Sequence, residues 1–428
     1  MKNRLCLASL RSIGMVLALV ALMTVGFWVL VQPAAHVAKA GTDQTTVLGD
    51  PLPGLTNLEK SMFDSGAVTF AKDWDVLAGL GPVFTQLGCQ ECHGTPTGGG
   101  SGTSATASTL FAKIDTDGKF DPLTNEGGML LQPFSNQHFI ANCRLKGEVI
   151  PTDATIVARH QPPQLYGGGL IDNIPDSQIL ANAVDKGLGI HGVANTVKDE
   201  NGNSRVGHFG LKAQVADLLQ FTASAMQQEM GVTNPVFFKE DLPQGKPFPP
   251  ACSPDSRPND DGTQMVAIYH YVVYLAPSAP GAGNSNGQAL FASVGCALCH
   301  IPPDTPSSYT TSADARVLKT WGGTKFHSSA LSGQPVNLYS DLLLHDLGTA
   351  DGDGIVMGSA FGNYWRTAPL WGLSVKLQNG VGLLHNGHAP DVPTAIAQHG
   401  GEATTVISNF NALSPLDQSD LIDFVKSL

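Results

Sequence analysis

The feature that most constrains this chain of 428 residues is a five-residue pattern, Cys-x-x-Cys-His, that occurs twice. Its members are Cys89, Cys92 and His93 in the first copy and Cys296, Cys299 and His300 in the second. Two thiols at this spacing can add to the two vinyl groups of one haem, and the next imidazole can reach the iron from the same side. With seven Cys and 13 His in the chain, chance does not account for two copies. The pattern predicts two covalently bound haems of the c type.

The alternative chemistry for Cys-x-x-Cys is a zinc site or a thiol redox site. A zinc site needs further ligands at matching spacing, and neither copy has them nearby in the sequence. We therefore expect His93 and His300 to be the proximal ligands of two haem irons.

The first forty residues predict export. A basic start at residues 2–11 precedes an apolar run at residues 13–31, and Ala-Lys-Ala at 38–40 has the small residues of a signal-peptidase site. The run is about 19 residues long, near the length that spans a bilayer, so an uncleaved membrane anchor is the alternative. Either way, we expect residues 1–40 to direct the rest of the chain to the periplasm.

The net charge bears on the choice of partner. Removing residues 1–40 removes four positive charges and no negative ones, so the formal charge would change from −12 to near −16. An acidic surface argues against binding to nucleic acid and favours a basic protein partner. No membrane contact is expected beyond an uncleaved N-terminal segment.

Three cysteines lie outside the two motifs. Cys6 leaves with the signal peptide, which leaves Cys143 and Cys252. An even pair in an oxidising compartment predicts a disulfide. Two buried free thiols are the alternative.

The two motif copies begin an apparent repeat. They lie 207 positions apart, and the same offset relates Arg159 to Arg366 and Pro162 to Pro369. Internal repetition predicts two domains of one design. We expect a mostly α-helical fold of two cytochrome c-like domains with long loops, related by internal duplication. The expected domains are residues 41–276 with the first haem and 287–428 with the second, joined by a Pro/Gly-rich linker at 277–286.

Helical patterns support this division. Four segments have helical patterns: the first has apolar residues near a period of 3.6, the second is rich in aromatic residues, the third leads into the second motif, and the last has an apolar stripe, while signals for strands are weak throughout. The segments are residues 211–230, 264–275, 287–294 and 415–428.

At this point the chain resembles the bacterial di-haem oxidoreductases that are related to di-haem cytochrome c peroxidases and to the di-haem enzyme that matures tryptophan tryptophylquinone. The resemblance implies a redox enzyme with unequal haems. It rests on residues 79–84, 166–170, 174–175 and 209–214, and most strongly on 340–348 (SDLLLHDLG), 365–372 (WRTAPLWG) and 399–403 (HGGEA).

The resemblance implies a sixth ligand for the second haem. In related peroxidases this ligand lies late in the chain, at the position that His399 occupies here. Met357, which lies 57 residues after His300, is the alternative. Aligning the two halves puts Lys186 opposite His399, and lysine is a poor ligand because its ammonium must first lose a proton. We therefore expect a six-coordinate second haem and an open or displaceable site on the first.

Further site residues are expected from chemistry and from the resemblance. Arg159 and Arg366 could pair with haem propionates, or with structural carboxylates instead. Peroxide cleavage needs an acid and a base above the iron. Relatives use a glutamate in the helix that here covers residues 211–230, where this chain has Leu219 or Gln220 instead. The candidates are Gln220, Glu229 and His208.

An acidic loop at residues 115–126 resembles a calcium loop, and related peroxidases hold a calcium between their domains. Phe120 stands where a calcium loop of the EF-hand type needs glycine, which favours a solvated acidic loop. Calcium is the alternative for this segment.

These observations combine into one functional expectation. We expect an exported di-haem oxidoreductase of the cytochrome c peroxidase type. Electrons would enter at the haem of His300 from a small cytochrome c or cupredoxin, and an oxidant would be reduced at the haem of His93. The alternatives are a non-enzymatic di-haem electron carrier and an enzyme that oxidises a protein.

Overall fold

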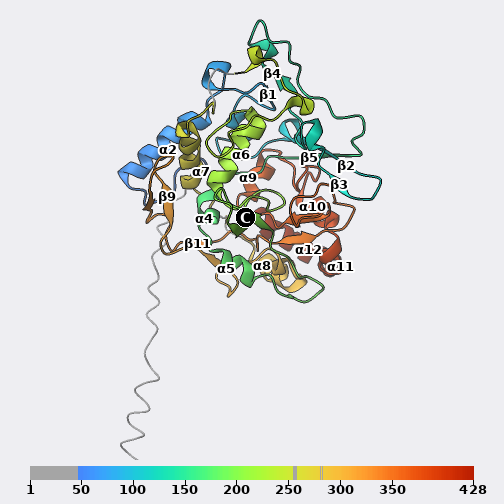
Figure 1. Ribbon diagram of the computed structural model, residues 1–428. Helices are drawn as coiled ribbons and strands as arrows, with labels where there is room; N and C mark the ends of the chain where they lie inside the picture. The colour runs from blue at the N-terminus through green and yellow to red at the C-terminus, as the bar shows by residue number, and fades with distance from the viewer. Residues whose placement is uncertain (1–46, 254–257, 280, 282) are drawn as a thin grey trace, which may run out of the picture. The chain divides into compact units, whose positions relative to one another are not determined.

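The structure, a computed structural model, describes residues 47–253, 258–279, 281 and 283–428. The expected signal peptide at 1–40, with Cys6, lies outside the described residues. The described chain belongs to one compact unit, Thr46–Leu428 (Figure 1). No helix within these described ranges combines the length and apolar character needed to cross a bilayer.

The helices begin and end where the sequence supplies caps. Thr56 and Glu59 form a reciprocal capping box at the start of α2, and Asp217 accepts the backbone N–H of Gln220 at the start of α6. Helix α6 ends at Gly231 in the left-handed conformation. The helices are α2 (Asn57–Phe70), α3 (Cys89–Cys92), α4 (Gly168–Asp172), α5 (Asp176–Ala181), α6 (Leu218–Met230), α7 (Thr263–Tyr274), α8 (Ser285–Val294), α9 (Leu373–Gln378), α10 (Val392–Gln398), α11 (Thr404–Asn411) and α12 (Pro415–Lys426).

Short antiparallel strands connect the helical parts. They form one three-stranded sheet, β3-β2-β5, and five strand pairs: β1-β4, β6-β7, β8-β11, β9-β10 and β12-β13. The strands are β1 (Val83–Phe84), β2 (Ser108–Ile114), β3 (Phe120–Asp121), β4 (Phe134–Ser135), β5 (Ile156–His160), β6 (Thr196–Lys198), β7 (Ser204–Val206), β8 (Tyr309–Thr310), β9 (Arg316–Leu318), β10 (Lys325–His327), β11 (Pro335–Val336), β12 (Leu344–Asp346) and β13 (Tyr364–Arg366).

The expected mostly α-helical fold is wrong. The structure is 32% helical and 14% strand with several small sheets, and no duplication is shown. The arginines that the 207-residue offset pairs also differ in environment. The Arg159 guanidinium is exposed and donates to the Ser104 carbonyl, whereas Arg366 is half-buried and donates to the Gly210 carbonyl. The physical reason for the missed strands is length, because most have two or three residues and cannot display a period of two.

Two hydrophobic clusters form most of the core. In the larger cluster, α2 packs against α7, and a Cβ on Gly66 would come within 2.3 Å of the Ala267 carbonyl oxygen. In the smaller one, α8 packs on α12, with the rings of Phe291 and Phe424 5.4 Å apart. The larger cluster also includes Trp371, which belongs to the C-terminal part of the chain. The domain division at 277–286 stays a prediction.

Four expected helices form, with one boundary changed. The segments at 264–275, 287–294 and 415–428 become α7, α8 and α12. The segment at 211–230 is helical only from Leu218, because Asp217 caps the helix there.

The predicted disulfide is confirmed. Cys143 and Cys252 are bonded, with their Cα atoms 4.8 Å apart, and both are buried. The bond joins segments that lie 109 residues apart in the sequence.

Candidate functional site

A cavity of about 330 Å³ lies where the α4, α6 and α7 region meets helices α8 to α12. Its walls are mostly apolar and come from both sides of residues 277–286. One wall includes Tyr166, Leu218, Phe221 and Val272. The opposite wall carries the second Cys-x-x-Cys-His motif and His399. A largely apolar cavity with a few polar groups is the usual environment of a bound cofactor.

The second motif opens directly onto this cavity. Cys296, Cys299 and His300 all line it, at the end of α8 and the short turn that follows. The Nδ1 atom of His300 lies 3.0 Å from the Tyr339 carbonyl oxygen, so Nδ1 carries the proton and Nε2 keeps its lone pair. Burial lowers the pKa of His300 to about 4, which keeps the ring neutral. A neutral imidazole with Nδ1 tied to a carbonyl is the usual form of a metal ligand.

His399 lines the same cavity, and its Nδ1 is also bonded to a backbone carbonyl. It is the residue that ends α10, and its Nδ1 lies 2.7 Å from the Ala395 carbonyl oxygen. Burial lowers the pKa of His399, so this ring is also neutral with a free Nε2. Charge repulsion from His399 lowers the pKa of His300, so the two rings lie within electrostatic reach. Both rings could therefore offer a nitrogen ligand to a haem iron held in this cavity.

The first motif lies on α3. Its residues do not line the cavity, but His93 contacts a residue that does. The Nδ1 atom of His93 lies 2.9 Å from the carbonyl oxygen of Pro163, which lines the cavity. Burial lowers the pKa of His93 to about 4. Burial also raises the pKa of Cys89 and of Cys92 to about 12, so both remain thiols at neutral pH. A reactive redox pair needs thiolates at neutral pH, so these environments do not fit such a pair.

Arg366 and Lys376, both half-buried, line the cavity. Arg366 donates from Nε to the Gly210 carbonyl at 2.8 Å, while its Nη1 is buried without a hydrogen-bond partner. Burial lowers the pKa of Arg366 to about 10 and that of Lys376 to about 8. A haem brings two propionates, and a carboxylate would satisfy the orphaned Nη1. The cavity therefore fits a haem in its apolar walls, its two neutral imidazoles and its basic side chains.

Sequence reasoning missed Lys376, because a lone lysine on a short helix, α9, has no distinguishing pattern. It also missed Trp371, whose carbonyl accepts a hydrogen bond from Gln164 and whose ring lies against Gly167. The aromatic side chains of Trp371 and Tyr166 both line the cavity. Only the aromatic-Gly pairs at 166–167 and 371–372 could have pointed to them.

Other candidates lie away from the cavity lining. Met357 packs with Leu110 and Ile355 beside the β2-β5 strands, and Arg159 is held by the carbonyls of Ser104 and Ala107. Neither is among the residues that line the cavity. The Lys186 ammonium is bonded to Asp341 and to the Leu298 carbonyl, so it lies at the second motif rather than at the first.

The three acid–base candidates differ in placement. Both ring nitrogens of His208 have partners, the Ile171 carbonyl and Asp176, and Gln220 donates to the Lys198 carbonyl. Glu229 is half-buried and accepts hydrogen bonds from Thr85 and Ser108. Burial raises the pKa of Glu229, and its charge raises the pKa of Cys92. Of the three, Glu229 is therefore the one beside the first motif.

The acidic loop at 115–126 closes the β2-β3 hairpin. The Asp115 carboxylate accepts the backbone N–H groups of Asp117 and Lys119, at 3.0 and 2.8 Å. Lys113 pairs with Asp121 and Asp153. These contacts hold the turn with protein donors and do not gather the carboxylates around one point.

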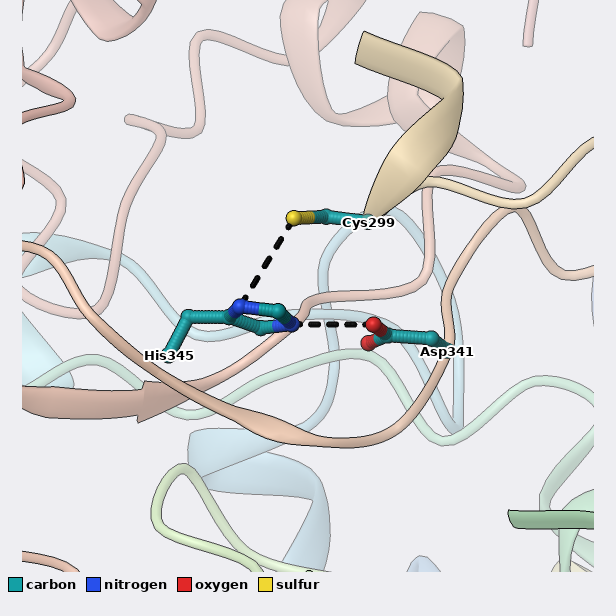
Figure 2. Close-up of side chains that lie close together, drawn as sticks. All are labelled: Cys299, Asp341 and His345. Carbon is teal, nitrogen blue, oxygen red and sulfur yellow. Dashed lines mark hydrogen bonds and ion pairs between the residues drawn. The ribbon is translucent and has the colours of Figure 1, made fainter. Parts of the chain in front are cut away.

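One other cluster lies beside the second motif (Figure 2). It contains Cys299, Asp341 and His345, and within the described residues it is the one group of three such side chains with closely spaced ligand atoms. His345 lies between the other two, with Nδ1 3.8 Å from Cys299 Sγ and Nε2 2.9 Å from the Asp341 carboxylate. Both nitrogens of His345 have carboxylate partners, since Nδ1 also lies 2.8 Å from Glu402. The contacts therefore form a hydrogen-bonded chain.

Comparison with solved structures finds a hydrazine synthase from Kuenenia stuttgartiensis, studied under 20 bar xenon, with 14% sequence identity. The match covers 93% of this chain and 100% of that chain, at a TM-score of 0.37. No curated protein matches the chain.

The family model described as "Di-haem oxidoreductase, putative peroxidase" matches residues 133–428, well over half of the chain. The matched segment contains the second motif, Arg366 and His399, and begins after the first motif. The chain therefore belongs to the di-haem oxidoreductase family, and haem is its cofactor.

Proposed function

We propose that this chain is an exported c-type di-haem oxidoreductase that takes electrons at the haem of His300 and reduces peroxide, or a similar oxidant, at the haem of His93. One observation carries the proposal. Two imidazoles with free Nε2 atoms, His300 and His399, line the cavity at the second motif, and the described residues of the opposite wall offer no comparable ligand. An iron with two strong ligands suits electron storage, and one with an open position suits reaction.

The residues that would hold the two haems follow from the site. Cys89 and Cys92 would bind the first covalently, and Cys296 and Cys299 the second. The Arg366 guanidinium and the Lys376 ammonium would receive propionates within the cavity. When bound, haem iron supplies one-electron chemistry and a coordination position for the oxidant.

The wall beside the first motif supports an open site. The described residues at positions up to 276 that line the cavity include no His, Met, Lys or Cys. Gln161, Gln164 and Tyr166 are its polar side chains, and burial raises the pKa of Tyr166 to about 12, so it stays a neutral phenol. We assign the proton-handling role to Glu229, which accepts hydrogen bonds from Thr85 and Ser108 beside Cys92 and whose pKa is raised by burial.

We further propose a periplasmic location and a basic redox donor, such as a small cytochrome c or a cupredoxin. The basic and apolar residues at 1–31 support export. The formal charge of −12 supports a partner of positive charge. A donor attracted by charge would react more slowly as salt is added.

The test is ligand binding and peroxide consumption by wild type and by the His93→Gly and His300→Gly variants. We expect cyanide or carbon monoxide to bind one haem of the two, the haem held by Cys89 and Cys92, and peroxide turnover to need both. If neither haem binds an added ligand in any redox state, the protein is an electron carrier and the peroxidase proposal fails.

A further inference from the structure

A chain of four buried charges ties the second motif to the loop that follows His399. The Lys186 ammonium binds the Asp341 carboxylate, Asp341 accepts from His345 Nε2 at 2.9 Å, and His345 Nδ1 lies 2.8 Å from Glu402. Lys186, Asp341 and His345 are almost wholly buried, and the Glu402 side chain is 16% exposed. None of these four residues is needed to hold haem covalently or to bind iron.

His345 must be an imidazolium in this arrangement. A neutral ring has one N–H, and here both nitrogens face carboxylate oxygens at hydrogen-bond distance. The positive charge lies 3.8 Å from Cys299 Sγ, the sulfur that would join the second haem. His345 therefore lies against the haem-attachment motif at Cys299 and is joined to Glu402 by a charge-assisted hydrogen bond, which is the strong kind.

Glu402 in turn holds the segment that begins at His399. One oxygen of Glu402 accepts the backbone N–H of His191 at 2.9 Å and of Gly192 at 3.3 Å, while the other faces the Asp346 N–H at 3.3 Å. Glu402 is three residues after His399, so these bonds determine how close the His399 segment lies to β12.

Gly400 and Gly401, which lie between His399 and Glu402, allow this segment to approach the backbone at the end of β12 closely. A Cβ on Gly401, which has φ +52°, would lie 2.2 Å from the Asp346 carbonyl oxygen. A Cβ on Gly400 would lie 2.8 Å from the Leu347 carbonyl oxygen. Backbone therefore meets backbone here, and only glycine leaves room for it.

We propose that His345 and Glu402 are positioning residues that keep His399 on the iron of the second haem, and so keep that haem six-coordinate. This inference rests on the proposed function, in which His399 is the sixth ligand. The contact between His345 and Glu402 acts on a loop, and the loop carries the ligand. Loss of the contact leaves the His399 segment free to move away from β12 and exposes the iron to added ligands.

The test uses Glu402→Ala, Gly401→Ala and the conservative Glu402→Gln in holoprotein with two haems. We expect Glu402→Ala and Gly401→Ala to convert the second haem partly to high spin. Cyanide should then bind this haem about ten-fold more tightly or better, since a hydrogen bond to a charged group is worth about 1.5–3 kcal/mol and 1.4 kcal/mol is a factor of ten in affinity. Glu402→Gln, which keeps an acceptor for His345, should restore much of the low-spin signal.

Asp391→Ala is the matched control. Asp391 caps the start of α10 through the Thr394 N–H at 2.8 Å and is exposed. It lies on the same helix as His399 but does not touch the loop after it. An equal spin change in Asp391→Ala, or none in both Glu402→Ala and Gly401→Ala, overturns the inference.

His399→Ala separates this inference from the proposed function. If His399→Ala changes the spin state and the loop variants do not, His399 binds iron without help from Glu402. If His399→Ala leaves the spectrum unchanged, the ligand assignment itself fails.

Discussion

Asp341→Asn is the sharpest test of the buried charges beside the second motif. The Asp341 carboxylate is fully buried and receives Lys186, His345 Nε2 and the backbone N–H of Leu343 at 3.1 Å. Asparagine has the same shape but carries no charge, and its amide nitrogen cannot accept a hydrogen bond. The substitution therefore leaves two buried cations facing one neutral group.

The magnitude follows from the partners that remain. Breaking a buried ion pair by removing one partner costs about 3–5 kcal/mol. Lys186 keeps the Leu298 carbonyl at 2.9 Å, and His345 keeps Glu402, so we expect the lower end, about 3 kcal/mol. Unfolding entropy of roughly 2.1 cal/mol/K per residue over about 380 residues gives ~0.8 kcal/mol/K. The melting temperature should therefore fall by about 4 °C.

The assay is calorimetry of the haem-loaded wild type, Asp341→Asn and the control Asp314→Asn. Asp314 has the same kinds of partner, Arg316 at 2.9 Å and His327 at 3.3 Å, but its side chain is 60% exposed. Exposed ion pairs contribute little, so this control should not shift the transition. A melting temperature for Asp341→Asn within one degree of wild type, or an equal drop in the control, would refute the reasoning.

Three further predictions follow from the site. Replacing Cys89 and Cys92 with Ala should remove one haem by mass and leave one, and retention of two covalent haems would contradict the attachment. Arg366→Leu should lower haem retention and the midpoint potential of one haem, since a cation that lines the cavity is lost, whereas the exposed Arg159→Leu should change neither in redox titration. The third concerns Glu402, whose pKa falls to about 2, mainly because hydrogen bonds and the charge of His345 outweigh burial. Its lowered pKa stabilises the fold above about pH 4.5, and this contribution should disappear as pH falls toward 2. Denaturation curves of Glu402→Gln should therefore be less sensitive to pH over that range, and a slope equal to that of wild type would count against the contact.

The sequence is most informative where chemistry dictates spacing. Cys-x-x-Cys-His identifies His93 and His300 from their neighbours alone, and the resemblance points to His399, whose Nδ1 is bonded to the Ala395 carbonyl. The pair Cys143–Cys252 follows from counting cysteines. Such features depend on the spacing of neighbouring residues or on the number of cysteines, so they can be predicted from the sequence alone.

The fold and the long-range contacts are harder to predict from the sequence. Two-residue strands such as β1 have no periodic signal, and the 207-residue offset suggests a common helical design that the structure does not have. The bond between Lys186 and Asp341 spans 155 residues. Nothing in the sequence around Lys186 indicates a partner at that distance, so aligning the two halves places it at the wrong motif.

The acid–base candidates show the same limit. His208 and Gln220 lie at or near the expected helix in the sequence, yet neither lines the cavity, and each is hydrogen-bonded to other residues. Glu229 lies beside Cys92 because α6 passes the first motif, which no local pattern reveals.

The most direct test of the account is electron paramagnetic resonance of the purified, fully oxidised protein, compared with His399→Ala and Met357→Leu. The account predicts one low-spin haem with two axial imidazoles, from His300 and His399, and a second haem with an open or displaceable position. His399→Ala should convert the low-spin signal to high spin, and Met357→Leu should leave it unchanged. A low-spin signal that survives in His399→Ala but is lost in Met357→Leu would contradict the central claim.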